Sequence, residues 1–166
     1  MSVVLDVLRT YRAPRLIMRR RIGSVEREDR ALATLMAACT LIFVAQWPRL
    51  SREAFQNVET TLEALMAGAL FGWLVIAPLA MYGIAFSVFL LMRLLRSSVS
   101  AYESRMSLFW ALLAAAPLWL LTGLMSGFSG ATTGTRVIGA LALGAFLVFW
   151  GLGLKEMASQ TRVEAQ

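Results

Sequence analysis

The amino-acid sequence predicts an all-α integral membrane helical bundle of four spans, preceded by an interfacial amphipathic helix at the N-terminus. Of the 166 residues, 58% are hydrophobic, well above the apolar share of soluble domains. The charges are segregated, because eight of the sixteen Lys and Arg residues precede Ala31 and long uncharged runs follow. A soluble fold would spread charge over every element, so this distribution indicates that lipid surrounds most of the chain.

Residues 1–30 are predicted to form a basic arm, cytoplasmic or interfacial, ahead of a transmembrane bundle over residues 31–155 and a polar tail over residues 156–166. Five apolar side chains of the arm share one helical face, while Asp6, Arg9 and Arg12 lie elsewhere around the helix. This pattern is typical of a helix lying among lipid headgroups. The five are Val3, Val4, Val7, Leu8 and Tyr11.

The arm also supplies candidates for binding anionic lipid headgroups or a partner protein, namely a helix-interrupting proline and the basic residues around it. They are Arg12, Pro14, Arg15, Arg19, Arg20 and Arg21. Basic residues just before a span are also what the positive-inside rule requires. A simple membrane anchor therefore explains them equally well.

Three of the four spans are plain in the sequence. The first, residues 31–47, has 17 residues and reaches about 26 Å at 1.5 Å per residue, and Pro48 and Arg49 are expected to end it. The third span is residues 106–125, and the fourth is residues 137–154. An uncharged loop rich in Gly, Ser and Thr joins the last two spans.

The second span is ambiguous, because residues 64–92 form an uncharged, mostly apolar run of 29 residues with Pro78 in the middle. One helix of that length would extend about 43 Å and would tilt, bend or protrude. Two full spans would need about 40 residues plus a turn. Pro78 marks either a kink in one long or broken helix or the turn of a re-entrant hairpin, so five spans are the alternative. Thr60 followed by Glu63 predicts a capping box at the start of this segment.

The distribution of Lys and Arg favours four crossings. With four crossings and the N-terminus inside, 13 of these residues lie inside and three outside, whereas five crossings give nine inside and seven outside. Because Lys and Arg concentrate on the cytoplasmic side of membrane proteins, the first arrangement is expected. Both termini are then cytoplasmic.

Small residues at helical spacing form stripes in two spans. Ala64, Gly68 and Gly72 make one stripe, and Ala140 and Gly144 make the other. This spacing lets helix backbones approach closely in lipid. Packing within the chain, a homodimer and contact with a partner helix all fit the pattern.

A small cavity is a further candidate in the second span. Pro78, Tyr82 and Gly83 are the residues that would line it, although a kink at Pro78 explains the proline by itself. Such a cavity would be needed if the protein were a channel or facilitator for a small neutral solute.

Several residue types are missing, and their absence bears on function. The chain has no histidine and its single cysteine is Cys39, so His/Cys metal sites and Ser-His-Asp or Cys-His catalysis are not expected, nor is any cofactor. No predicted span contains Asp, Glu, Lys or Arg, which disfavours ion-coupled transport. The net charge of +6 is explained by the membrane-flanking arginines, and no nucleic-acid-binding motif accompanies it.

Three stretches resemble the bacterial Yip1 family of membrane proteins, in its short alphaproteobacterial form. They are Tyr-Arg-Ala-Pro-Arg at 11–15 with Met-Arg-Arg-Arg at 18–21, the apolar run at 108–121, and Phe-Trp-Gly-Leu-Gly-Leu-Lys-Glu at 149–156. The resemblance implies a multi-span protein of the bacterial cytoplasmic membrane without enzymatic activity. The chain lacks the family's Tyr-Gly-Pro element and the charge count favours four spans over the family's five, so GTPase binding and vesicle traffic are not carried over.

The expected function is therefore that of a non-enzymatic membrane adaptor or scaffold, which organises or stabilises other membrane components. Its expected partners are anionic membrane lipids and another membrane protein, with a homodimer as a further arrangement. The alternatives are a channel or facilitator for a small neutral solute and an accessory subunit of a larger membrane complex.

Overall fold

The computed structural model describes residues 3–22, 27–57, 59–95 and 99–164, and every regular element in these ranges is helical. Two short helices, α1 (Val3–Thr10) and α2 (Pro14–Ile22), precede the long helix α3 (Glu28–Gln56). The second long segment consists of α4 (Leu62–Phe71), a π-helical turn η1 (Gly72–Ile76) and α5 (Ala77–Leu94). The last helices are α6 (Ala101–Ser129) and α7 (Thr133–Glu164).

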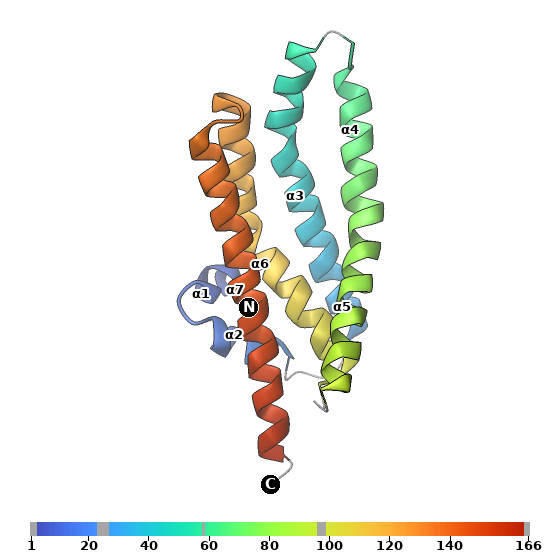
Figure 1. The fold of residues 1–166 in the computed structure, drawn as a ribbon, viewed down its shortest axis with the longest axis vertical. Helices are drawn as coiled ribbons and strands as arrows, with labels where there is room; N and C mark the ends of the chain where they lie inside the picture. The colour runs from blue at the N-terminus through green and yellow to red at the C-terminus, as the bar shows by residue number, and fades with distance from the viewer. Residues whose placement is uncertain (1–2, 23–26, 58, 96–98, 165–166) are drawn as a thin grey trace.

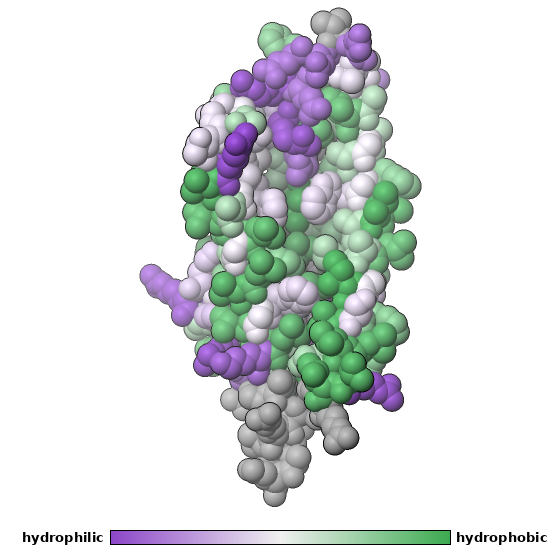
Figure 2. All heavy atoms as spheres, in the orientation of Figure 1, coloured by the Kyte–Doolittle hydropathy of each residue, from purple (hydrophilic) through white to green (hydrophobic). Residues whose placement is uncertain are grey.

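Four helical segments are long and apolar enough to cross a membrane, which confirms the predicted membrane bundle. They are Glu28–Gln56, Leu62–Leu94, Ala101–Ser129 and Thr133–Met157. The long helices stand side by side (Figure 1). Hydrophilic side chains gather over the upper end of the molecule, above a mainly hydrophobic band (Figure 2). The chain is therefore a multi-span membrane protein, in which the apolar band meets lipid.

The two ends of the bundle differ in charge, and we name them accordingly. The basic end carries the start of α3, the end of α5, the start of α6 and the C-terminal part of α7, with Arg93, Arg105 and Lys155. The opposite end carries the α3–α4 and α6–α7 connections, with Arg49 and Arg136.

The second span crosses the bundle once, which decides between the two alternatives left open by the sequence. Residues Leu62–Leu94 form one continuous helical segment that contains the π-turn η1. In this turn the N–H of Ala77 bonds to the carbonyl of Gly72, five residues earlier, just before Pro78. Because proline has no N–H, the preceding carbonyls lose a partner, and a π-turn is a common way to absorb that loss. Pro78 thus disturbs the helix without reversing it.

The prediction that Pro48 ends the first span is wrong, because α3 continues for two further turns to Gln56. Leu50 is buried, and Arg49 pairs with Glu53 at 3.2 Å one turn later. The guanidinium of Arg52 donates to the carbonyls of Gly127 and Phe128, at 3.2 and 3.0 Å. These contacts hold the last turns of α3 against the end of α6 and satisfy carbonyls that the end of that helix leaves free.

Two helix starts also differ from the predicted ones. Thr61, and not Thr60, caps α4, since its hydroxyl accepts from the N–H of Ala64 at 3.3 Å. Helix α6 begins five residues before the predicted span, where Ser100 and Glu103 form a reciprocal capping box. The Ser100–Glu103 spacing is visible in the sequence, but the predicted start at Met106 followed the beginning of the apolar run. One more helical turn therefore carries Arg105 into the bundle.

Helix α6 forms the centre of the bundle. Its residues 106–116 are buried without a break, and it packs most extensively against α3 and α7. Its two halves run in different directions (Figure 1), and Pro117 lies inside it, as expected for a proline kink. A helix buried on all sides needs neighbours on all sides, and the N-terminal arm provides one of them.

The arm packs against the protein, which corrects the predicted arrangement of its faces. Val7 is buried, and it lies with Val3, Val4 and Leu8 beside a hollow whose other wall belongs to α3 and α6. Asp6, which was placed among the polar residues, is buried as well. An apolar helix face can be covered by protein as well as by lipid, and the sequence pattern does not distinguish the two.

Candidate functional site

The second span is the least enclosed of the first three spans, and the candidate site lies along it. Only 6% of its most apolar window is buried within the chain, against 39% for the first span and 50% for the third. Two hollows flank it, one between α3 and α4 towards the opposite end and one between α5 and α6 towards the basic end. Much of the surface available to a ligand or partner therefore lies on this helix, although the fourth span, 17% buried, is also open.

The first hollow, which we call the α3–α4 groove, has a volume of about 490 Å³. The predicted small-residue stripe of Ala64, Gly68 and Gly72 forms one wall of it. A methyl group added at Gly68 or Gly72 would meet nothing within 4 Å, so neither glycine is needed for packing within the chain. The remaining lining residues are Gln46, Arg49, Leu50, Leu65, Ala69 and Trp73.

The predicted stripe in the last span also faces away from other helices. Ala140 is exposed, and a methyl group at Gly144 would meet nothing within 4 Å. Close helix approach is instead made by two glycines of α6 that the sequence reading passed over. A methyl group at Gly123 would overlap the carbonyl oxygen of Ala45, and one at Gly127 would lie 2.9 Å from the carbonyl carbon of Pro48. These glycines, four residues apart, are what the α3–α6 crossing requires.

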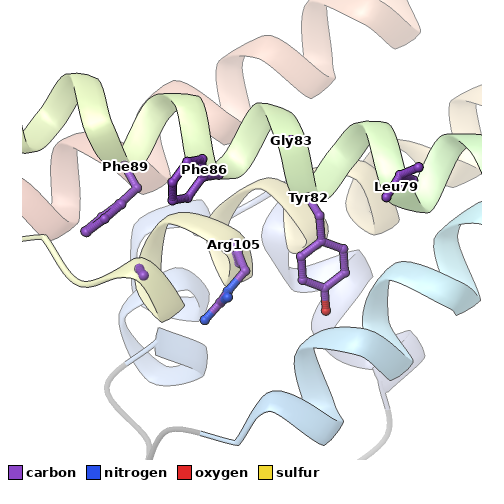
Figure 3. A pocket seen from close by; sticks show the side chains of 7 residues that line it. Leu79, Tyr82, Gly83, Phe86, Phe89 and Arg105 are labelled. Atoms are coloured by element: carbon purple, nitrogen blue, oxygen red, sulfur yellow. The ribbon is translucent and has the colours of Figure 1, made fainter.

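The second hollow, which we call the α5–α6 pocket, also has a volume of about 490 Å³. It brings together two of the three predicted cavity residues, Tyr82 and Gly83, while Pro78 is buried outside its lining. Figure 3 shows Leu79, Phe86 and Phe89 along α5 and the Arg105 side chain opposite them on α6. Ala101 completes the lining.

The walls of the α5–α6 pocket are held by contacts close to it. The buried hydroxyl of Ser104 donates to the carbonyl of Ala85 at 2.9 Å, which ties α6 to α5. The ring of Tyr82 packs edge-on against Phe109, with centroids 5.0 Å apart. Arg105 forms an ion pair with Glu28 at the start of α3. The pocket is thus a preformed space with one cationic side chain on its α6 wall, between Phe86 and Tyr82 along its length (Figure 3).

The predicted arm residues lie in and between α1 and α2, and this helix pair is docked against α6 and α7. The Tyr11 hydroxyl donates to the carbonyl of Ala114 at 2.8 Å, and its ring meets that of Phe149 edge-on at 5.2 Å. Burial raises the pKa of the Tyr11 phenol, which further favours its protonated, donating form. The indole of Trp110 donates to the buried hydroxyl of Thr10 at 3.2 Å.

Of the six arm candidates, Arg12, Arg15 and Arg20 are exposed, and Pro14 is half-buried at the first position of α2. Arg19 and Arg21 lie in α2, but their side chains are outside the described part of the chain. Arg12 and Arg15 are exposed where they can reach headgroups, while Ile17 of α2 is buried. The helix pair is therefore a docked part of the bundle that presents some of its basic residues outwards.

Other polar groups of possible chemical use are few. Within the described ranges, no group of three or more His, Cys, Asp or Glu side chains is placed to hold a metal ion. Cys39 is a free, buried thiol in the middle of α3. The carboxyl group of Asp6 is buried among the helices, although no predicted span contains an acid. Asp6 lies outside the predicted spans, so the absence of acidic residues from those spans does not extend to it.

Sequence reasoning missed Arg105, Glu28 and the α6 glycines for separate reasons. Arg105 directly precedes the apolar run that predicts the third span, so hydropathy leaves it outside that span, whereas the Ser100–Glu103 spacing places it inside a helix. Nothing in the sequence pairs it with Glu28, which is 77 residues away.

Comparisons of the chain with protein-family models, curated proteins and solved structures give no match.

Proposed function

We propose that this protein is a non-enzymatic membrane scaffold, which binds a transmembrane helix of another membrane protein along its second span. The observation that carries the proposal is the exposure of that span. Only 6% of its most apolar window is buried within the chain. A helix surrounded by lipid gains nothing further from the hydrophobic effect by association, so the partner must be held by close packing and polar contacts.

The α3–α4 groove offers both kinds of contact. Gly68 and Gly72 leave open space beside the backbone, which would let a partner helix approach closely. Gln46 and Arg49 lie at the same groove and supply polar groups near the end of the span. Trp73 adds a large flat surface. A single apolar helix with a polar or acidic residue near its end would satisfy this set.

We also propose that the protein resides in the bacterial cytoplasmic membrane with both termini in the cytoplasm. The support is the distribution of Lys and Arg along the sequence, with 13 in the segments predicted to lie inside and three in those predicted to lie outside. Membership of the bacterial Yip1 family remains a proposal that rests on the three stretches of sequence given above. The four spans differ from the five usual in that family, so the adaptor function does not depend on it.

The proposal is tested by placing a photo-crosslinking amino acid at Gly68 of the full-length protein in native membranes. The matched control places it at Leu141, a 60%-exposed residue of α7 that faces away from the groove. We expect Gly68 to give one discrete protein adduct and Leu141 to give lipid adducts only. Lipid adducts at both positions, or the same protein adducts at both, would contradict a specific partner site.

A homodimer would be recognised by an adduct of twice the mass of the chain, and it would replace the foreign helix by a second copy. The bulky substitution Gly68→Leu should abolish the specific adduct in either case, because it fills the groove without a clash inside the chain. The same substitution should leave the folded bundle intact, which gel filtration in detergent would verify.

The alternative of a facilitator for a small neutral solute would use the α5–α6 pocket. Its lining is mainly apolar, and its polar side chains are Tyr82 and the charged Arg105. A neutral polar solute would gain little from this mainly apolar lining and would bring no negative charge to Arg105. The pocket chemistry therefore favours a different ligand.

A further inference from the structure

We propose that the α5–α6 pocket is a binding site for an anionic phospholipid, with the headgroup phosphate at Arg105 and one acyl chain along α5. The inference goes beyond the scaffold function, because it concerns a different hollow at the other end of the second span. It rests on the shape of the pocket, the residues along its length and the charge of Arg105 on its α6 wall.

The apolar part of the pocket has the dimensions of an acyl chain. Its lining on α5 extends over eleven residues, from Leu79 to Phe89, which is a rise of about 15 Å along a helix. This is about half of the hydrocarbon thickness of a bilayer, the depth that one leaflet provides. Leu79 and Phe86 are 75% and 58% exposed, so the pocket lies on the lipid-facing side of the bundle. An acyl chain can therefore enter it from the side.

The polar part of the pocket lies at headgroup level. Arg105 is the fifth residue of α6, about 6 Å along the helix from its start at the basic end. Its side chain is 28% exposed, and it is the only charged side chain among the described lining residues. A guanidinium group presents several N–H donors to phosphate oxygens. An anionic headgroup at this position would be complementary to the cation.

Glu28 is the competing group, because it already forms an ion pair with Arg105. It approaches from α3 and is not among the lining residues, so it orients the guanidinium without filling the pocket. The Nε atom of Arg105 is buried and has no hydrogen-bond partner in the described part of the chain. The cation is therefore incompletely satisfied by Glu28, and a phosphate would add donor–acceptor pairs that the protein does not supply.

The test compares phosphatidylglycerol with phosphatidylcholine of identical acyl chains, offered in equal amounts to the purified full-length protein in detergent. Native mass spectrometry counts the lipids that remain bound. We expect about a fivefold preference for phosphatidylglycerol, the size of effect of one basic residue near an anionic group. An absence of preference would overturn the proposal. Displacement of the lipid by inorganic phosphate would show that a free anion, and not a lipid, is recognised, which would also overturn it.

Three variants make the test specific. Arg105→Gln should abolish the preference, whereas Arg93→Gln, which removes an exposed arginine at the same end, should preserve it. Glu28→Gln should preserve or increase the preference, since it frees the guanidinium. An equal loss in Arg93→Gln would show that general surface charge is responsible and would refute the site.

A fourth variant tests the site independently, so that the proposal can still be refuted if Arg105→Gln does not fold. Gly83→Leu fills the pocket. A methyl group added at Gly83 would meet nothing within 4 Å, so the substitution causes no clash at its first carbon. It should therefore fold normally and lose the preferred lipid. Gly68→Leu, which fills the α3–α4 groove instead, should keep it. Unchanged lipid binding in a folded Gly83→Leu protein would contradict the assignment.

Discussion

Replacing Gly123 by alanine should destabilise the bundle, because the backbones of α3 and α6 meet at this residue. The added methyl group would overlap the carbonyl oxygen of Ala45, which is main chain and cannot rotate away. The helices would have to separate, and overpacking of this kind costs about 1–3 kcal/mol. Separation would also pull the end of α6 away from Arg52, whose two bonds to carbonyls of that end hold the helices together.

The matched control is Gly68→Ala, which makes the same chemical change where an added methyl group meets nothing within 4 Å. Alanine favours helix over glycine by about 1 kcal/mol, so the control should be neutral or more stable than the natural protein. The difference between the two variants removes this propensity effect. It should equal the packing cost, about 1–3 kcal/mol.

The measurement is the free energy of unfolding in mixed micelles, obtained by titrating sodium dodecyl sulfate and following the fluorescence of the five tryptophans. Gly127→Ala should behave like Gly123→Ala, because its methyl group would press on the backbone of Pro48. Equal stabilities of Gly123→Ala and Gly68→Ala, within about 0.5 kcal/mol, would refute the close approach of α3 and α6.

Three further outcomes follow from single contacts. Ser100→Ala should cost about 1 kcal/mol of unfolding free energy in the same titration, because it removes the cap of α6; an unchanged value would contradict the capping box. Tyr11→Phe should let trypsin cleave the arm about fivefold faster, because it removes the hydrogen bond to Ala114, worth about 1 kcal/mol; equal cleavage rates would show that the arm is held elsewhere. Reporter fusions should place Gln166 in the cytoplasm and Thr133 on the other side, whereas a C-terminus outside would overturn the proposed orientation.

The membrane class and a preference for four spans were predictable from the sequence, whereas the path of residues 64–92, one crossing or a hairpin, was decided only by the structure. Lipid demands long apolar runs whose backbone bonds close within one helix, and such runs are visible in composition alone. The charge count chose four crossings over five even though residues 64–92 were ambiguous. The ends of the helices were less predictable. Helix α3 passes Pro48 because Arg52 and Leu50 are held by other parts of the bundle.

The candidate site was predictable only in part. Tyr82 and Gly83 do line a pocket, but its charged residue comes from α6, and no local pattern reports that two helices bring Arg105 opposite Phe86. The arm shows the same limit. Its apolar residues Val3, Val4, Val7 and Leu8 lie beside α3 and α6, and the sequence pattern alone does not identify these neighbours.

The sequence by itself thus determined which segments cross the membrane, since transfer into lipid depends on the composition of each segment alone. The tertiary structure decided which small residues are packed. Pairs of small residues four apart occur at Gly68 and Gly72, at Ala140 and Gly144, and at Gly123 and Gly127, and they are equivalent as patterns. Only the α6 pair meets another backbone, because the choice depends on which helices come together and at which angle. The other two pairs are left open, and the one on the second span is the surface that we assign to a partner.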